Sequence, residues 1–374
     1  MRLRFFQGPQ VLQPGHDGRG RTRGYHRVRL WLREGQAGTA DTLRTRVRFA
    51  AAVAATSDYP TLREACRLAE AGGFDAFARP DHLLAEGVQA PPGAPLLECF
   101  TTIAALVPTT TRLRFLQTVA CNSFRSPALL AKMVATLDVI SGGRMELGLG
   151  AGWLRHEYQA FGYDFPPAPV RLAQLREALQ VVKLLWTGEQ VDYTGVHYRL
   201  RAAQCAPRPL QRPRPPIMVG GGGSGLLAVA AAEADIVNIV PPASRGAADP
   251  EAVRRFSLAR FQEKAARVRR LAEEAGRDPQ RVTLSAMFFV QIADSGAATH
   301  ALVDAVAARY QLTPAEAERF PLTLIGTPTQ LCERLAERIA HLDLGYVVLH
   351  LASPADLTRF GTEVLPGVAG TVRT

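Results

Sequence analysis

The feature that most constrains the fold of this chain is a regular alternation of short apolar runs with longer segments of helical periodicity. From Val47 onward, eight runs of strand length are separated by segments in which apolar residues recur every three or four positions. Such alternation is typical of a parallel sheet, because parallel strands need helical crossovers between them. Eight units favour closure of the sheet. The sequence therefore predicts an α/β fold, a (β/α)8 TIM barrel.

The elements of the predicted barrel can be placed along the chain. The eight strand segments are RVRFAAAV, FDAFA, RLRFLQTVA, RMELGLGAG, PPIMVGG, ADIVNIV, RVTLSAMFFVQIA and GYVVLHL. The clearest amphipathic helix is RLAQLREALQVVKLLWTG, with leucines at three- and four-residue spacing. A long helix is expected from Pro250 to Gly276, and the last from Thr327 to Leu342. The stretches 153–170 and 294–321 interrupt the alternation of strand and helix segments, and we expect loop insertions there.

The positive charge of the chain is concentrated in its first part. The net charge is +10, but residues 1–48 contain eleven arginines and only three acidic residues, so the remainder is nearly neutral. Nucleic-acid binding would need a basic patch on the folded domain, and no such partner is expected. Residues 1–45 are rich in Gly and Arg and lack periodicity. They are predicted to be a disordered basic leader or a misassigned start, followed by the barrel domain, residues 46–374.

Several other classes of protein are disfavoured by what the sequence lacks. No apolar run reaches the roughly 18 residues that a membrane span requires, and no signal peptide opens the chain, so a cytoplasmic protein without a membrane partner is expected. The five cysteines are widely spaced and form no C-x-x-C pair. No two histidines stand four residues apart on a helix. We therefore expect neither a disulfide framework nor a metal site.

One pair of polar residues directly follows the second predicted strand. Asp81 and His82 come at the end of FDAFARPDH. In a barrel, the residues just past the C-terminal ends of the strands face the active site. A histidine there can stabilise or protonate a charge that develops near neutral pH, and the aspartate can bind a ring N–H or a hydroxyl. The alternative is that Asp81 caps a helix beside a histidine without a function.

Two glycine-rich segments also follow predicted strands. GLGAGW, residues 148–153, departs from the dinucleotide-binding fingerprint, because its third glycine comes one residue early and a Pro-rich loop follows. GGGGSG, residues 220–225, lies between a strand and a helix. Its backbone N–H groups and the helix N-terminus together could bind a phosphate. The alternative is a flexible loop with no ligand.

Taken together, these segments resemble the luciferase-like monooxygenase superfamily, and most of all its branch of deazaflavin (coenzyme F420) oxidoreductases. The stretches that carry the resemblance are GFDAFARPDH, FRSPALLAKMVATLDVISGGRMELGLGAGWLRHEY, GVHYRL and RPPIMVGGGG, which occur in the family order over residues 47–240. The resemblance implies a bacterial luciferase-like TIM barrel with loop insertions. Its redox cofactor would lie at the C-terminal ends of the strands.

The resemblance also assigns roles to individual residues. It implies that His82 is catalytic and that a non-proline cis peptide joins Thr118 and Val119. The substrate pocket would be lined by Trp153 and His156. The residues expected to bind the cofactor are Asp81, Thr118, Val119, Asn122, Gly152, Gly220, Gly221, Gly222 and Gly223.

The sequence departs from the family pattern at Trp153. The sugar-phosphate dehydrogenases of this branch have a glutamate there as acid/base, so a flatter, more apolar pocket and another small-molecule substrate are expected. The first hypothesis is a coenzyme F420-dependent oxidoreductase that transfers a hydride to or from that substrate. The alternatives are an FMN-dependent monooxygenase and a non-catalytic protein that binds a flavin or deazaflavin. A homodimer is left open.

Overall fold

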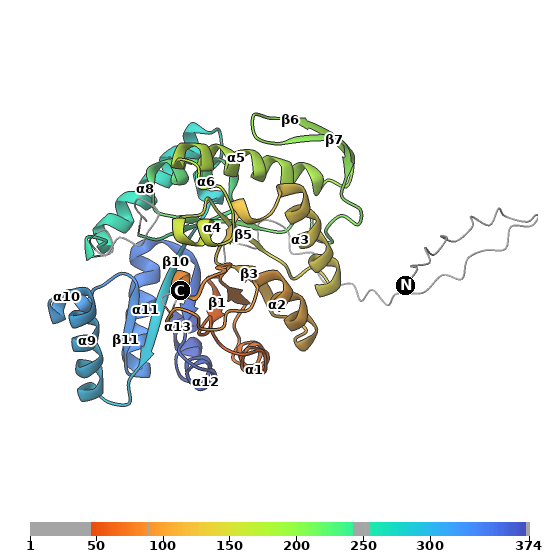
Figure 1. Cartoon of the computed structure of the whole chain (residues 1–374). Helices are drawn as coiled ribbons and strands as arrows, with labels where there is room; N and C mark the ends of the chain where they lie inside the picture. The colour runs from red at the N-terminus through yellow and green to blue at the C-terminus, as the bar shows by residue number, and fades with distance from the viewer. Residues whose placement is uncertain (1–45, 89, 242–250, 252–253, 372–374) are drawn as a thin grey trace, which may run out of the picture. The chain divides into compact units, whose positions relative to one another are not determined.

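The computed structural model of the protein describes residues 46–88, 90–241, 251 and 254–371 (Figure 1). The predicted leader, residues 1–45, lies outside the described residues, so the division of the chain at residue 45 stays a prediction. Among the described residues, none of the helices combines the length and the apolar character that a membrane crossing requires.

The centre of the fold is a parallel β-barrel, as the alternation predicts. The neighbouring strands follow the order β3-β2-β1-β12-β10-β9-β8-β5-β4. Their bounds are β1 Arg48–Ala52, β2 Ala76–Arg79, β3 Arg114–Gln117, β4 Ala120–Cys121, β5 Leu147–Gly150, β8 Ile217–Gly221, β9 Ile236–Ile239, β10 Thr283–Ile292 and β12 Leu344–His350. All pairs in this order are parallel. The eight predicted strands are thereby confirmed.

The barrel closes through its third strand, which is split into β3 and β4. β3 pairs with β2, and β4 pairs with β5. A single β-bridge pairs Phe115 of β3 with Met145, which lies just before β5. This bridge joins the third strand to β5 nearer the N-terminal end of the barrel. β3 and β4 therefore act as one bent strand that completes the ring.

The predicted helices surround this barrel (Figure 1). Their bounds are α1 Tyr59–Ala71, α2 Cys99–Leu106, α3 Pro127–Ser141, α5 Ala168–Leu185, α6 Ser224–Glu233, α8 Leu258–Glu274 and α11 Pro328–Leu342. Local chemistry sets several ends: the Ser126 hydroxyl accepts from the Leu129 N–H at the start of α3, and Gly142 ends it in the left-handed conformation. α8 begins later than predicted, because Ser257 caps it.

Other elements were not predicted as regular structure. They are the antiparallel hairpin β6 Gln190–Thr194 and β7 Arg199–Gln204, the strand β11 Thr323–Gly326, the helices α4 Arg155–Ala160, α9 Gly296–Tyr310, α10 Pro314–Glu318, α12 Pro354–Glu363 and α13 Leu365–Thr371, and the 3-10 turns η2 Ala85–Val88, η3 Val107–Thr109, η4 Asn122–Phe124 and η5 Pro279–Arg281. The predicted loop insertion at 294–321 is therefore largely helical. α9 and α10 pack with β11 in a separate apolar cluster.

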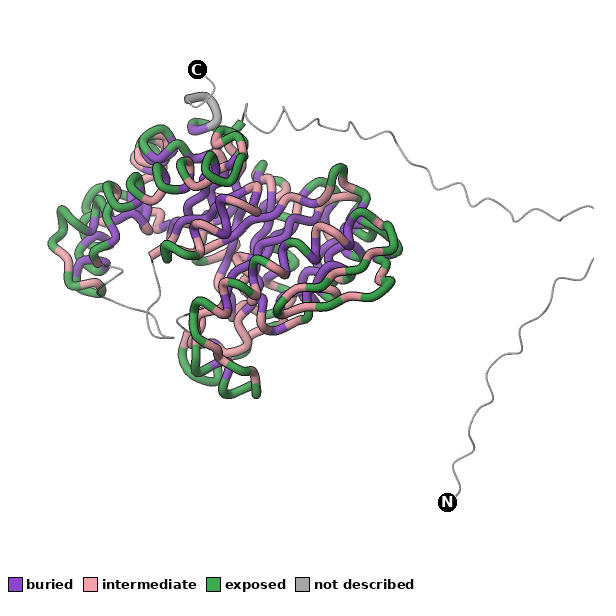
Figure 2. Tube along the Cα trace, turned by 90° about the horizontal axis from the view of Figure 1, so that it is seen from above, coloured by how far each residue is buried: buried purple, intermediate pink, exposed green. Residues whose placement is uncertain are grey.

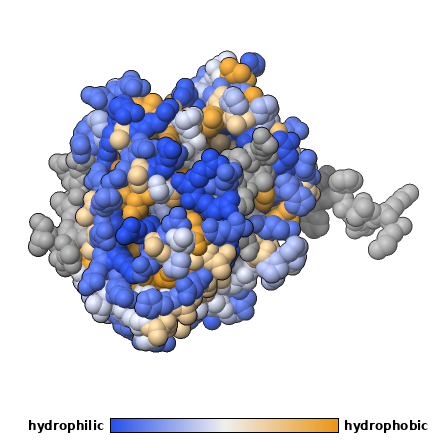
Figure 3. All heavy atoms as spheres, turned by 90° about the vertical axis from the view of Figure 1, so that its left-hand side faces the viewer, coloured by the Kyte–Doolittle hydropathy of each residue, from blue (hydrophilic) through white to orange (hydrophobic). Residues whose placement is uncertain are grey.

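The apolar core has two layers, and the buried trace follows the strands (Figure 2). The outer layer lies between the barrel and the helices. The inner layer fills the barrel with alternate strand residues, namely Ala50, Ala52, Ala76, Ala78, Leu116, Met218, Ile236, Tyr346 and Val348. By contrast, the side of the molecule drawn in Figure 3 is mainly hydrophilic, with small scattered apolar patches.

A buried ion cluster lies at the N-terminal end of the barrel. Glu146 is fully buried, and its Oε1 accepts from Arg48 at 2.7 Å and from Arg114 at 2.6 Å. Burial disfavours its charge, but the two arginines outweigh that effect and lower the pKa of the carboxyl. The three residues come from the starts of β1 and β3 and from the residue before β5. The barrel is therefore filled by charged pairs at this end.

Candidate active site

At the opposite end, the C-terminal ends of the strands, Asp81 connects β2 to the segment after β4. The carboxylate is buried and accepts from the Cys121 N–H at 2.9 Å. The guanidinium of Arg125 donates to both of its oxygens, at 2.7 and 2.9 Å, and also to Glu98 at 2.6 Å. Burial raises the pKa of Asp81 and Arg125 opposes that rise. The carboxylate is thus already used within the protein, and a direct contact with a cofactor stays a prediction.

His82 is held by a carboxylate that the sequence analysis missed. Its Nδ1 lies 3.0 Å from Oε2 of Glu157, which is itself buried. The other oxygen of Glu157 accepts from the backbone N–H groups of Leu83 and Leu84. A carboxylate can only accept here, so Nδ1 of His82 carries the proton and Nε2 is left for other partners.

The ring of His82 is fixed from two further sides. Trp153 packs against it edge to face, with ring centroids 5.6 Å apart and planes at 82°. Gly87 approaches from another side, and a Cβ atom there would lie only 2.2 Å from Nδ1. The structure therefore brings together the predicted His82 and Trp153. It adds Glu157 and Gly87 as the groups that orient the imidazole.

His156 occupies a different position from its neighbour in sequence. It is exposed on α4, whereas Glu157 is buried beneath the loop after β2. Consecutive residues on a helix point about 100° apart, so only one of the two can face His82. The sequence did not show which face of this short helix is buried, because the segment was expected to be irregular. The exposed position of His156 gives no support to its predicted role in the substrate pocket.

The predicted cis peptide lies between Thr118 and Val119. The Val119 side chain enters the inner layer of the barrel. Cβ atoms at Gly148, Gly150 and Gly220 would lie 3.2, 2.8 and 2.9 Å from its atoms. These glycines therefore provide the space that Val119 fills. Gly220, predicted for the phosphate site, has this packing role in addition to any role in binding.

Gly152 allows the loop after β5 to approach Tyr158. Its φ is 74°, and a Cβ atom there would lie 1.8 Å from the tyrosine hydroxyl. That hydroxyl donates to Ser123 Oγ at 2.9 Å and lies 3.1 Å from Cys121 Sγ. Burial raises the pKa of Cys121 to about 11, so the thiol stays protonated at neutral pH. The hydroxyl of Tyr158 therefore links α4 to the end of β4 structurally.

Asn122 lies at the start of the turn after β4 and is buried. Its Nδ2 donates to the Tyr198 hydroxyl at 3.2 Å, whereas its Oδ1 has no hydrogen-bond partner among the described residues. Tyr198 lies between β6 and β7, where Glu177 accepts from the backbone N–H groups of this turn. The hairpin therefore contacts the site through Tyr198, and Asn122 retains a free acceptor.

The four glycines of the predicted phosphate cradle run from the end of β8 to the start of α6. Gly223 caps this helix, and nothing lies within 4 Å of a Cβ atom placed there. Lys264 of α8 donates to the carbonyl oxygen of Gly222 at 2.6 Å. The sequence analysis missed this lysine, since α8 carries many basic residues and only the packing of α8 on α6 selects one. The cradle thus combines open backbone, a helix N-terminus and an ammonium group.

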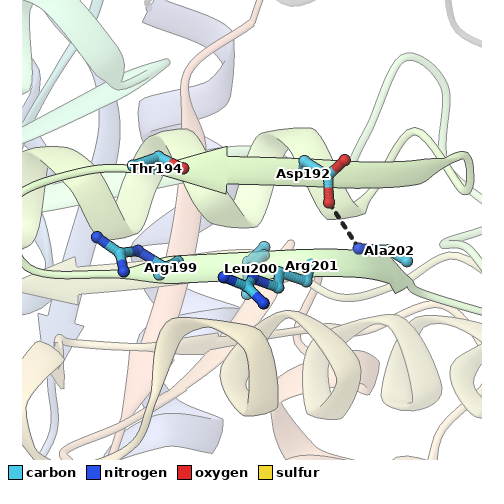
Figure 4. Close-up of a pocket in the computed structure, with 6 residues that line it drawn as sticks. All are labelled: Asp192, Thr194, Arg199, Leu200, Arg201 and Ala202. Carbon is cyan, nitrogen blue, oxygen red and sulfur yellow. Dashed lines mark hydrogen bonds between the residues drawn. The ribbon is translucent and has the colours of Figure 1, made fainter.

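A shallow hollow elsewhere on the surface belongs to the hairpin alone. It is lined by Asp192, Thr194, Arg199, Leu200, Arg201 and Ala202 (Figure 4). Asp192 accepts from the Ala202 N–H at 2.7 Å across the two strands, which draws the hairpin together. None of the predicted site residues lines this hollow. Within the described residues, no three His, Cys, Asp or Glu side chains are grouped so that they could hold a metal ion.

The closed parallel barrel, with polar side chains gathered past its strand ends, defines the class of (β/α)8-barrel enzymes. Residues 43–343 match the luciferase-like monooxygenase family. This match covers most of the sequence, so the chain belongs to that family. The resemblance inferred from the motifs is thereby confirmed.

Relatives with different cofactors match this chain. It is 36% identical over 160 residues to an F420-dependent glucose-6-phosphate dehydrogenase of Microbacterium testaceum, which covers 42% of this chain and 45% of that protein. It is 28% identical over 291 residues to an FMNH2-dependent dimethylsulfone monooxygenase of Pseudomonas putida, which covers 72% of this chain and 78% of that protein. The first match therefore spans less than half of that relative.

A solved structure shows the same fold at low identity. An F420-dependent secondary alcohol dehydrogenase, in complex with an F420-acetone adduct, superposes with a TM-score of 0.70 and 19% identity, over 86% of this chain and 99% of that one. At this identity the likeness concerns the fold. Family and neighbours together indicate an oxidoreductase with a flavin-type cofactor.

Proposed function

We propose that this protein is a coenzyme F420-dependent oxidoreductase that transfers a hydride between the deazaflavin and a small organic substrate. The observation that carries the proposal is the oriented His82. Its Nδ1 is bound by Glu157 and its ring is packed on Trp153, past the C-terminal end of β2. When bound, the deazaflavin supplies the hydride chemistry, and the protein supplies position and charge.

The part of His82 in this proposal follows from its tautomer. Glu157 fixes the proton on Nδ1, so Nε2 can accept a proton or, when the ring is protonated, donate one. A group of this kind stabilises charge that changes during hydride transfer. Trp153 packs edge to face against the same ring and restricts its rotation.

The residues present fit a flavin-type cofactor. The open backbone around Gly223, the N-terminus of α6 and Lys264 fit its phosphate. Burial, together with neighbouring arginines, lowers the pKa of Lys264, which still leaves a donor at this position. The unpaired Oδ1 of Asn122 fits a ring N–H. Asp81 holds the end of β4, directly before Asn122, through its bond to the Cys121 N–H.

An FMN-dependent monooxygenase is the second candidate. The observation that favours it is the relative from Pseudomonas putida, whose match covers more of this chain than the match to the F420-dependent relative. A different small-molecule substrate from glucose 6-phosphate is proposed in both cases, because Trp153 stands where the sugar-phosphate dehydrogenases are expected to have an acidic residue.

Titration of the purified protein with coenzyme F420 and with FMN, followed by absorbance and fluorescence, tests the proposal. Tight, saturable binding of F420 and weaker binding of FMN is the expected result. Tight FMN binding with oxygen uptake after reduction would replace the first candidate by the second. Binding of F420 without turnover across alcohols, ketones and imines would indicate the non-catalytic alternative. The predicted cytoplasmic location, and the question whether the protein forms a homodimer, need separate measurements.

A further inference from the structure

The mouth of the barrel contains a histidine that the proposed function does not use. His350 is the last residue of β12. Alternation along the strand places it on the same face as Tyr346 and Val348, which belong to the inner layer of the barrel. Its register partner on β1 is Ala52, another member of that layer. His350 therefore points inward at the end of the barrel where His82 lies.

An aromatic residue accompanies it from the other neighbouring strand. Phe289 of β10 is the register partner of His350, and the two ring centroids are 5.2 Å apart with planes at 38°. Phe289 follows Met287 at a spacing of two, and Met287 packs against the inner layer. The two rings therefore form one surface on the inner rim of the barrel, contributed by β10 and β12.

The nitrogens of His350 are free in the part of the chain that the structure describes. Neither ring nitrogen has a hydrogen bond to a described residue, although the side chain is partly buried. Burial, with a smaller effect of the nearby Arg79 guanidinium, lowers its pKa to about 4. At neutral pH the ring is uncharged and offers one donor and one acceptor. Neither nitrogen is among the buried polar atoms that lack a partner, so both are accessible at the mouth of the barrel, where a group from outside the protein can bond them.

We propose that His350 and Phe289 form a substrate-binding wall, in which the imidazole hydrogen-bonds an uncharged oxygen of the substrate and Phe289 covers an adjoining apolar group. This inference rests on the proposed function and names its substrate class: a small hydroxyl or carbonyl compound with an apolar part. A neutral imidazole suits both forms of that oxygen, because it accepts from a hydroxyl and donates to a carbonyl. An anionic substrate gains no ion pair from it.

Binding of simple probes to the cofactor-loaded protein tests this wall. Cyclohexanol and cyclohexanone are the neutral probes, and cyclohexanecarboxylate is the charged one. With labelled histidine, the His350 ring signal, assigned by its loss in His350→Phe, should shift saturably with both neutral probes and little with the carboxylate. Equal responses to all three probes, or none, would overturn the proposal. Failure of F420 and FMN to bind would instead defeat the proposed function.

Variants separate a binding role from a structural one. His350→Phe should weaken binding of the neutral probes about 5- to 10-fold, the size of one lost hydrogen bond, and leave cofactor affinity within twofold. His350→Gln, which keeps a donor and an acceptor, should recover most of that loss. The matched control is His300→Phe, because His300 is exposed on α9. Unchanged probe binding in folded His350→Phe would overturn the inference. If that variant does not fold, His350→Leu, which also removes both ring nitrogens, takes its place with the same expected loss.

Discussion

The two ends of the barrel bury charged residues in opposite ways. At the N-terminal end, Glu146 lies between Arg48 and Arg114 and is fully buried. At the C-terminal end, Glu157 binds one ring nitrogen of His82 and leaves the other ring nitrogen available. Asp81 similarly fixes the segment on which Asn122 retains an unpaired oxygen. The carboxylate at the N-terminal end completes the packing, whereas the two at the C-terminal end orient groups toward a ligand.

This difference follows from the geometry of a parallel barrel. All strands point the same way, so one end carries the strand starts and the loops that come from the helices, and the other carries the strand ends and the loops that lead into the helices. Stability and function are therefore separable, and substitutions at the two ends should affect different measurements.

Loss of the carboxylate at the N-terminal end should have the largest effect, and on stability alone. Glu146→Ala leaves Arg48 and Arg114 without their shared partner, which should lower the free energy of unfolding by about 3–5 kcal/mol. Urea unfolding measures this. Cofactor affinity of the folded variant should remain within twofold. A large loss of affinity at full folding would show that the two ends are coupled.

Loss of the imidazole at the C-terminal end should reduce the chemical step. His82→Ala should slow hydride transfer about 10²-fold, a typical size for a lost acid or base, and change cofactor affinity much less. Stopped-flow single turnovers measure the rate. His156→Ala is the comparison, because His156 is exposed on the same helix as Glu157 and should give a nearly normal rate. An unchanged rate in the His82 variant removes it from the mechanism.

Glu157→Gln tests whether a carboxylate at this end acts through His82. The amide can still accept from the backbone of Leu83 and Leu84, but it no longer requires the proton of His82 to stay on Nδ1. The rate should fall about tenfold with a displaced pH profile, within the range for outer-sphere partners of a histidine. Glu70→Gln is the matched control, since Glu70 also accepts backbone N–H groups, before β3. Similar effects of both changes would indicate a structural role.

The pH dependence of stability should show the smallest effect, and it tests the ion cluster at the N-terminal end. The folded-state pKa of Glu146 is lowered by Arg48 and Arg114 against the effect of burial. Its contribution is therefore complete above the unfolded pKa, about 4.3, and is lost as the pH falls through the lower folded value. The stability difference between wild type and Glu146→Gln should shrink below about pH 4.3. A constant difference down to pH 2 contradicts the lowered pKa.

By itself, the sequence determined the eight barrel strands, the main helices between them and their order. Apolar periodicity gave all eight strands, and caps such as Ser126 with Gly142 set helix ends, because these signals depend on neighbours in the chain. The position of Asp81 and His82 after β2 followed from the same alternation. The helix α9 was missed because its apolar residues do not gather on one face as those of α11 do, and α10 is too short to show a helical period.

Only the tertiary structure decided which side chains meet. Glu157 rather than His156 faces His82, Lys264 is the basic residue of α8 that reaches Gly222, and His350 lies beside Phe289. These contacts join residues more than 40 positions apart, and each depends on the rotational phase of a helix or the register of two strands. Local sequence sets neither quantity closely, because both are fixed by packing of the whole barrel. The strands that carry His82 and His350 at their ends were therefore predictable, whereas the partners of these two side chains were not.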